Sequence, residues 1–194
     1  MSEGFMKSAL ERALERADQI EVPEEKLKEM EHRSQGEQIA AAFLRDPKYA
    51  LAEELDRFDR EARKYVSKAV ESILLQNLVL PRKESDVARN EEVFRGLSAI
   101  KKNKNGLRQA KDQLANLSNY YVQAVRQNYE QLKSDVEREM KQAIQQKTGM
   151  NAGVKFNVEQ SPEFQETWRQ LSRKLDAEYE KALTQLKQQI AAMD

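Results

Sequence analysis

Apolar residues recur at every third or fourth position through most of the chain, which is the spacing of one face of an α-helix. Prolines and small polar clusters interrupt this pattern at only a few places. The segments between the interruptions predict six helices, at residues 5–20, 23–45, 47–79, 84–103, 106–147 and 161–192. The fold class is therefore expected to be all-α.

The interruptions also predict how these helices begin and end. Asp46 with Pro47 and Ser161 with Pro162 both resemble an N-cap followed by proline in the first turn. Pro81 follows an apolar run and should end the third helix, because the residue before a proline avoids the helical conformation. The polar stretch 101–106 contains two asparagines and a glycine, so it predicts either a turn or a weak point in a continuous helix.

The loop 148–160 joins the two longest predicted helices. Its residues 154–158 alternate like a strand, but a lone short strand has no partner, and we interpret the whole stretch as an ordered loop. A loop of this length can turn the chain back on itself. The fifth and last helices are therefore expected to form an antiparallel, coiled-coil-like hairpin, with the third helix alongside.

The apolar positions also repeat every eleven residues. In the last helix the repeat consists of Phe164, Trp168 and Leu171, then Leu175, Tyr179 and Ala182, then Leu186, Ile190 and Met193. The same spacing starts at Leu107 in the fifth helix and at Leu51 in the third. Eleven residues in three turns is about 3.67 per turn, so the apolar stripe stays on one face of a nearly straight helix. The pattern predicts an elongated bundle of long helices.

Pro23 separates a first amphipathic segment from the rest of the chain. Residues 1–22 are expected to form an N-terminal helix or arm, and residues 23–194 the elongated bundle. The arm could dock on the bundle, dimerise or enter a groove on a partner. Its polar face mixes Glu and Arg, which argues against a helix that lies on a membrane surface.

Composition narrows the class of protein. Lys plus Arg and Asp plus Glu number 33 each, and this balance speaks against a strongly basic nucleic-acid binder. Charged residues make up 34%, above the roughly 25% of ordinary domains, as expected where surface is large relative to core. There are no cysteines, so disulfides and thiolate metal sites are excluded. With no apolar run long enough for a transmembrane helix and no signal-peptide pattern, we expect a cytoplasmic protein.

Catalytic and metal-binding patterns are weak. His32 is the only histidine, and Glu29 stands three residues before it, whereas a di-iron bundle needs such a Glu-x-x-His motif on two helices. Most of the many carboxylates have a base three or four residues away, as Glu137 has Lys141, which indicates a salt-bridged surface. The glycines fit no phosphate-binding loop. We expect no catalytic residues, no metal and no cofactor.

One basic cluster stands out in the otherwise balanced chain. It consists of Lys101, Lys102, Lys104, Arg108 and Lys111. These side chains could contact phosphates of nucleic acid or of an anionic membrane, although no aromatic residues are interleaved with them. A lysine-rich helix junction explains the same residues without any ligand.

The sequence therefore favours a non-enzymatic structural or interaction protein, a scaffold or adaptor whose partner is another protein or a second copy of itself. The alternative is a peripheral binder of nucleic acid or anionic membrane that uses the basic segment 101–111. A third class, an enzyme or metal carrier, is disfavoured by the single histidine and the absence of cysteine.

Overall fold

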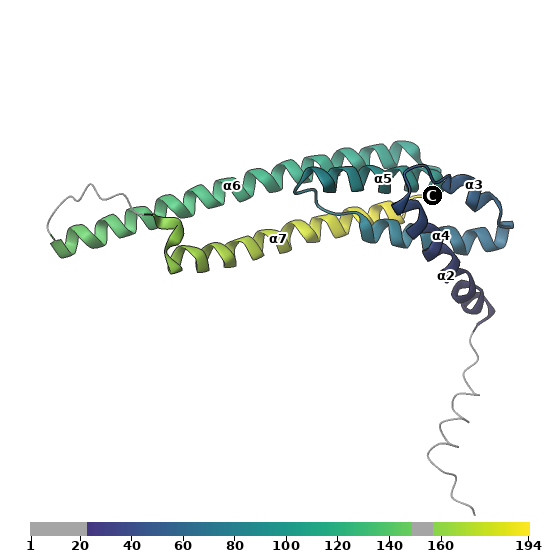
Figure 1. Cartoon of the computed structure of the whole chain (residues 1–194), viewed down its shortest axis with the longest axis horizontal. Helices are drawn as coiled ribbons and strands as arrows, with labels where there is room; N and C mark the ends of the chain where they lie inside the picture. Colours follow the sequence, from purple (N-terminus) through teal and green to yellow (C-terminus); the bar gives the residue numbers. More distant parts are fainter. Residues whose placement is uncertain (1–22, 149–156) are drawn as a thin grey trace, which may run out of the picture. The chain divides into compact units, whose positions relative to one another are not determined.

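A computed structural model of the protein describes residues 23–148 and 157–194 (Figure 1). These residues form six α-helices and one 3-10 turn, and they contain no strand. The elements are α2 (Glu24–Arg45), α3 (Leu51–Asp56), α4 (Arg60–Asn77), α5 (Glu84–Ile100), α6 (Lys104–Thr148), η1 (Val158–Gln160) and α7 (Pro162–Ala191). The all-α prediction is confirmed, while the predicted arm at 1–22 lies outside the described residues.

The chain divides into two compact units, Met1–Ser72 and Ile73–Asp194. The first contains α2, α3 and most of α4, and the second contains the end of α4 together with α5, α6, η1 and α7. The predicted division after residue 22 falls at the edge of the described residues, so it stays a prediction.

In the first unit, α2 packs closely against α4. Gly36 permits this approach, because a Cβ at this position would lie 2.6 Å from the Cβ of Ala69 and 2.7 Å from the carbonyl oxygen of Val66. Exposed ion pairs line the same contact: Lys28 Nζ lies 2.6 Å from Glu61 Oε1, and Lys68 Nζ lies 2.9 Å from Glu29 Oε1. Exposed pairs of this kind stabilise a fold little, so the close backbone contact sets the packing.

The prediction of one continuous helix over 47–79 is wrong. Asp46 ends α2 instead of starting a helix, and its Oδ1 accepts a hydrogen bond from the backbone N–H of Lys48 at 2.9 Å. A second break precedes α4, where Asp59 Oδ1 accepts from the N–H groups of Glu61 and Ala62, both at 2.9 Å. Asp59 is thus the N-cap that the sequence reading missed, because neither proline nor glycine marks it.

The buried face of α4 agrees with the predicted stripe only at its start. The predicted positions Ala62 and Val66, eleven residues after Leu51 and Leu55, are buried, so the count holds across Asp59. Farther along α4 the fully buried positions are Val70 and Leu74, whereas the predicted Ala69 and Ile73 are only half-buried.

The second unit is dominated by the antiparallel pairing of α6 with α7 (Figure 1). At one end the Nζ of Lys101 donates to the carbonyl oxygen of Met193 at 2.6 Å. Farther along, the ring of Tyr129 meets the ring of Trp168 edge to face, with the centroids 5.0 Å apart. Phe164 is buried there with Val136 and Val158, so η1 belongs to the same small core.

The helices of the second unit begin and end where short polar side chains satisfy the backbone. Asn103 Oδ1 accepts from the N–H of Gly106 at 2.8 Å and caps α6, so the chain turns at residues 101–103 and the rest of the polar stretch 101–106 is the first turn of α6. Ser161 Oγ accepts from the N–H of Phe164 at 3.2 Å, and Pro162 occupies the first turn of α7, as predicted. The α5 helix runs beside the first part of α6 (Figure 1).

Candidate interaction surface

The five residues of the basic segment occupy different environments. Lys101 is only 7% exposed, and its Nζ donates to the carbonyl oxygens of Ala191 at 3.1 Å and Met193 at 2.6 Å. The neighbouring backbone N–H groups of Lys102 and Asn103 each donate to Asp194 O at 3.0 Å. Lys101 therefore secures the end of α7, where a cation meets helix-terminal carbonyls favourably.

Lys104, Arg108 and Lys111 are exposed and lie in the first turns of α6. Lys104 Nζ donates to the neutral carbonyl oxygens of Ser98 and Lys101, the latter at 2.8 Å, and no carboxylate in the described part of the chain pairs with it. Lys111 pairs with Glu91 of α5 at 2.6 Å. Arg108 and the exposed Lys102 have no side-chain partner among the described residues.

Lys104, Arg108 and Lys111 line one side of a groove between α5 and α6, which we call the α5–α6 groove. Its basic compartment has a volume of about 400 Å³ and is lined by Arg95 and Ser98 of α5 and by Lys104, Leu107 and Arg108 of α6, among others. Arg95 itself pairs with Glu92 at 2.6 Å. The remaining positive charge makes this compartment suited to carboxylates or phosphates.

An apolar compartment of about 210 Å³ adjoins the basic one. It is lined mainly by apolar and small residues, among them Val87, Phe94, Leu114 and Ala115, and it shares Glu91, Phe94 and Lys111 with the basic compartment. Val87 is 49% exposed, and Val122, one turn beyond the apolar compartment on α6, is 53% exposed. The groove is therefore basic near the start of α6 and apolar farther along it.

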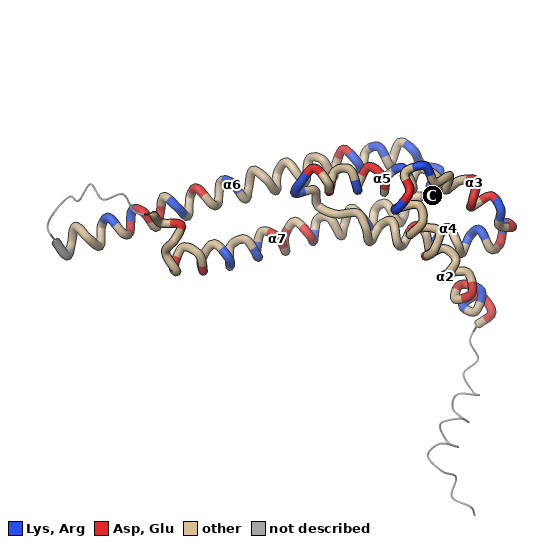
Figure 2. Tube along the Cα trace, in the orientation of Figure 1, with Lys and Arg blue, Asp and Glu red and all other residues tan. Residues whose placement is uncertain are grey.

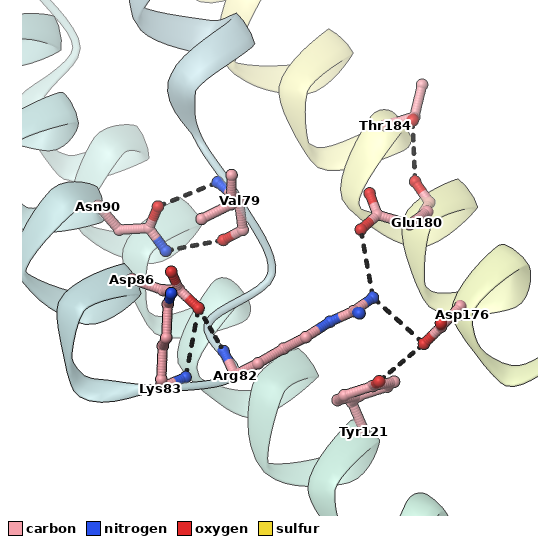
Figure 3. Close-up of polar contacts among 9 residues, drawn as sticks. All are labelled: Val79, Arg82, Lys83, Asp86, Asn90, Tyr121, Asp176, Glu180 and Thr184. Carbon is pink, nitrogen blue, oxygen red and sulfur yellow. Dashed lines mark hydrogen bonds and ion pairs between the residues drawn. The ribbon is translucent and has the colours of Figure 1, made fainter. Parts of the chain in front are cut away.

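A second polar cluster joins the segment before α5 to both long helices (Figure 3). Arg82 Nη2 lies 3.2 Å from Asp176 Oδ1 and 3.7 Å from Glu180 Oε1, and the guanidinium lies 5.1 Å from the ring centre of Tyr121. The hydroxyl of Tyr121 donates to Asp176 Oδ1 at 2.7 Å. The cluster links α6 to α7 at one defined point.

Asn90 holds the extended segment before α5 in place (Figure 3). Its Oδ1 accepts from the N–H of Val79 at 3.0 Å, and its Nδ2 donates to the carbonyl oxygen of the same residue at 2.7 Å. Asp86 accepts from the N–H of Arg82 at 3.1 Å. Asn90 is 5% exposed, so this single amide satisfies backbone groups that would otherwise lack partners.

The pKa of Tyr121 is raised, chiefly because burial disfavours the phenolate and also because the phenol donates to Asp176. A raised folded-state pKa gives stability that is complete below the unfolded pKa of about 10 and is lost as the pH rises through the folded value. We expect Tyr121→Phe to cost about 1 kcal/mol at pH 8 and less above pH 10. Urea midpoints at both pH values test this, with exposed Tyr120→Phe as control; an equal cost at both would contradict it.

His32 and the carboxylates, the other candidates from the sequence, contact neighbouring side chains near the protein surface. His32 is stacked on Tyr65 with ring centres 6.3 Å apart, and its Nδ1 lies 3.2 Å from Gln35 Oε1. Glu137 pairs with Lys141 at 2.7 Å, as predicted. Within the described ranges, no three His, Cys, Asp or Glu residues converge in a way that could hold a metal ion. No helix in those ranges has the length and apolar composition needed to cross a bilayer.

The structural roles of Arg82 and Asn90 were not predicted from the sequence. Asn90 lies in an ordinary helical pattern, and a polar residue there gives no signal of burial. Nothing in the sequence signals the contact of the Tyr121 hydroxyl with Asp176, although the ring itself is half-buried. Arg82 pairs with Asp176, which is far away in the sequence, so this contact can be recognised only in the folded structure.

The described residues are all-helical, with α6 packed along α7 and a groove between α5 and α6. The chain belongs to a family of unknown function (DUF6657), whose model matches residues 52–192. No curated protein and no solved structure showed significant similarity to it. The matched region contains the α5–α6 groove and the α6–α7 hairpin.

Proposed function

We propose that the protein is a non-enzymatic scaffold or adaptor of the cytoplasm, which acts through contacts with another protein or with a second copy of itself. The observation that carries this proposal is the pairing of α6 with α7 along one apolar stripe. We further propose that α6 and α7 form an antiparallel hairpin with an eleven-residue repeat. This hairpin would be long enough to separate the molecules bound along it.

The burial of α7 supports the repeat. The eight stripe residues of this helix, from Phe164 to Ile190, are buried or half-buried, and so is Met193 just after its end. In α6 the positions Leu107, Ser118, Tyr129 and Met140, eleven residues apart, are likewise buried or half-buried. A stripe that keeps its face over so many turns favours straight helices over a left-handed supercoil.

The lengths of the helices support a spacing role. The 45 residues of α6 correspond to about 67 Å and the 30 residues of α7 to about 45 Å, at about 1.5 Å per residue. Charged residues of both signs recur along both helices (Figure 2). Such a surface keeps a thin, extended pair in solution while leaving its faces available for partners.

Capture of partners from a lysate of the source cells, with and without nuclease and at two salt concentrations, tests this proposal. We expect a specific protein that is retained under all conditions. Light scattering and small-angle X-ray scattering on the purified chain provide the matching test of self-association and length. A compact monomer that retains no protein partner would contradict the scaffold role.

A second candidate function is binding of nucleic acid or of an anionic membrane through the basic segment 101–111. It is favoured by the exposed side chains of Lys102 and Arg108, and it is weakened by Lys101, whose ammonium is engaged inside the fold. Binding to DNA or to phosphatidylserine vesicles should then decrease steeply with salt. Loss of this binding in Lys102→Ala/Arg108→Ala, but not in exposed Arg126→Ala, would assign it to the segment.

A further inference from the structure

We propose that the middle of the α6–α7 pair is a flexible joint between two separate apolar cores. We call residues 115–128 of α6 and 169–182 of α7 the middle stretch. This inference goes beyond the proposed scaffold role and rests only on the packing of α6 along α7. The joint lets the far end of the pair change direction while the cores on both sides of it stay intact.

The first core, the base core, lies where α5 packs beside the first part of α6 (Figure 1). Three helices contribute to this part of the fold, and both long helices bury apolar side chains in it. These side chains, none of them more than 5% exposed, are Leu107, Ala110 and Leu114 of α6 and Leu183, Leu186 and Ile190 of α7. The α5 layer starts close to Ser118, whose hydroxyl donates to the carbonyl oxygen of Pro81 at 2.8 Å.

The second core, the tip core, lies toward the other end of the pair. Val136, Val158 and Phe164 are buried there, at 6%, 2% and 3% exposure. The rings of Tyr129 and Trp168, whose centroids are 5.0 Å apart, pack against these residues on the side of the base. The tip core is formed by α6, η1 and α7, so it is complete without α5.

Neither core extends through the middle stretch. In residues 115–128 and 169–182, all of which the structure describes, every side chain is half-buried or exposed. Even Tyr121, Val125 and Leu175, which lie on the apolar stripes, are only half-buried. Most of the stability of a helix in water comes from the packing of its apolar face. The turns between the two cores therefore open more readily than the turns within either core.

Each helix also has a polar side chain in this stretch that bonds to its own backbone. Asn128 Nδ2 donates to the carbonyl oxygen of Ala124 at 2.8 Å, and Ser172 Oγ donates to that of Trp168 at 2.7 Å. Both side chains are half-buried, and both lie just on the base side of the contact between Tyr129 and Trp168. A side chain that bonds to the carbonyl four residues earlier slightly destabilises a helix and often bends it. These two bonds locate the joint.

A polar contact keeps the two helices together beside the joint. The hydroxyl of Tyr121 donates to Asp176 Oδ1 at 2.7 Å, and Arg82 pairs with the same carboxylate at 3.2 Å (Figure 3). These contacts link α6 to α7 at one level without burying much apolar surface. The helices therefore remain associated at Tyr121 while the turns between this residue and the tip core bend.

Amide hydrogen exchange on the full-length protein tests the difference in local opening. We expect residues 119–128 and 170–180 to exchange at least about tenfold faster than residues 107–114 and 183–190 of the base. They should also exchange faster than residues 134–140 of the tip core. Equal protection of the middle stretch and the base would overturn the proposal.

Leucine at the two polar positions provides a matched pair of variants. Asn128→Leu/Ser172→Leu removes both bonds to the backbone and adds apolar contact, so exchange in the middle stretch should slow about tenfold. Gln127→Leu/Ala177→Leu places leucine at exposed positions of the same helices and should leave the exchange unchanged. If both variants slowed exchange equally, the polar positions would not locate the joint.

Spin labels on α6 test the bending itself, because the chain has no cysteine of its own. Asp112→Cys and Glu139→Cys place the labels at exposed positions on either side of the middle stretch. A straight helix would hold these positions about 40 Å apart. We expect a broad distribution that reaches shorter distances, and a single narrow peak once Asn128→Leu/Ser172→Leu is added. A narrow peak in both backgrounds would contradict the joint.

The outcomes separate the joint from the proposed function, because exchange and label distances are measured on the purified chain alone. A narrow label distance in a chain that retains a specific protein partner would refute the joint and leave the scaffold role standing. Fast exchange and a broad label distance in a chain without partner or self-association would support the joint and refute the scaffold role.

Discussion

Replacing Gly36 by alanine should destabilise the first unit by about 2 kcal/mol. Overpacking typically costs about 1–3 kcal/mol, and the helix propensity gained from glycine to alanine, about 1 kcal/mol, offsets part of it. We place the net cost high because the new Cβ would lie 2.7 Å from a backbone oxygen, that of Val66, which cannot turn aside like a flexible side chain. Urea or thermal unfolding followed by circular dichroism measures the loss.

Ser34→Ala supplies the control for this substitution. Ser34 is in the same helix and is exposed, so alanine there should be neutral or slightly stabilising. A Gly36→Ala variant as stable as the parent would show that α2 and α4 do not pack as closely as the geometry indicates.

Replacing Asn90 by alanine should destabilise the second unit by a similar amount, about 2 kcal/mol. The substitution leaves the N–H and the carbonyl oxygen of Val79 without their side-chain partner in a largely buried setting. The segment before α5 should loosen, and amide hydrogen exchange at Val79 should become faster. Chemical denaturation and exchange measured by NMR give the two readouts.

Asn128→Ala is the matched control, because that amide only donates to the carbonyl oxygen of Ala124 in its own helix, at 2.8 Å. We expect its cost to be well below that of Asn90→Ala. Asn90→Asp adds a test by pH. Its carboxyl must be protonated to donate to Val79, so its folded pKa should be raised, and its deficit should shrink as the pH falls through that raised value and stay constant below the unfolded pKa of about 4. Equal costs at Asn90 and Asn128 would contradict the bridging role.

The helices with strong local signals could be predicted from the sequence. Ser161 and Pro162 predict the start of α7, and the spacing of apolar residues from Phe164 to Met193 predicts its less exposed face. The break before α4 could not be predicted with the same rules, because Asp59 alone marks it among other acids. Single residues such as Asp that could cap a helix are common in sequences. They act as caps only where the N–H groups that follow need an acceptor.

The candidate site was predictable only in part. The cluster from Lys101 to Lys111 marks the helix junction at which the α5–α6 groove begins, since charge is visible in the sequence. The sequence could not separate Lys101, which faces the end of α7, from Arg108, which faces solvent, because burial depends on a helix ninety residues away. The apolar half of the groove consists of ordinary helix residues from α5 and α6, and only their pairing creates it.

The contacts at the end of α7 determine how α6 and α7 are aligned along their length. The eleven-residue stripe that we propose would allow α6 and α7 to slide by one repeat, about 16 Å, with nearly the same apolar contacts. Such a slide would bring Ala182 to the place of Met193 and would remove the carbonyl oxygens that Lys101 binds. It would also separate Tyr121 from Asp176. These few polar contacts therefore select one register for the two helices, where the proposed stripe alone would tolerate several.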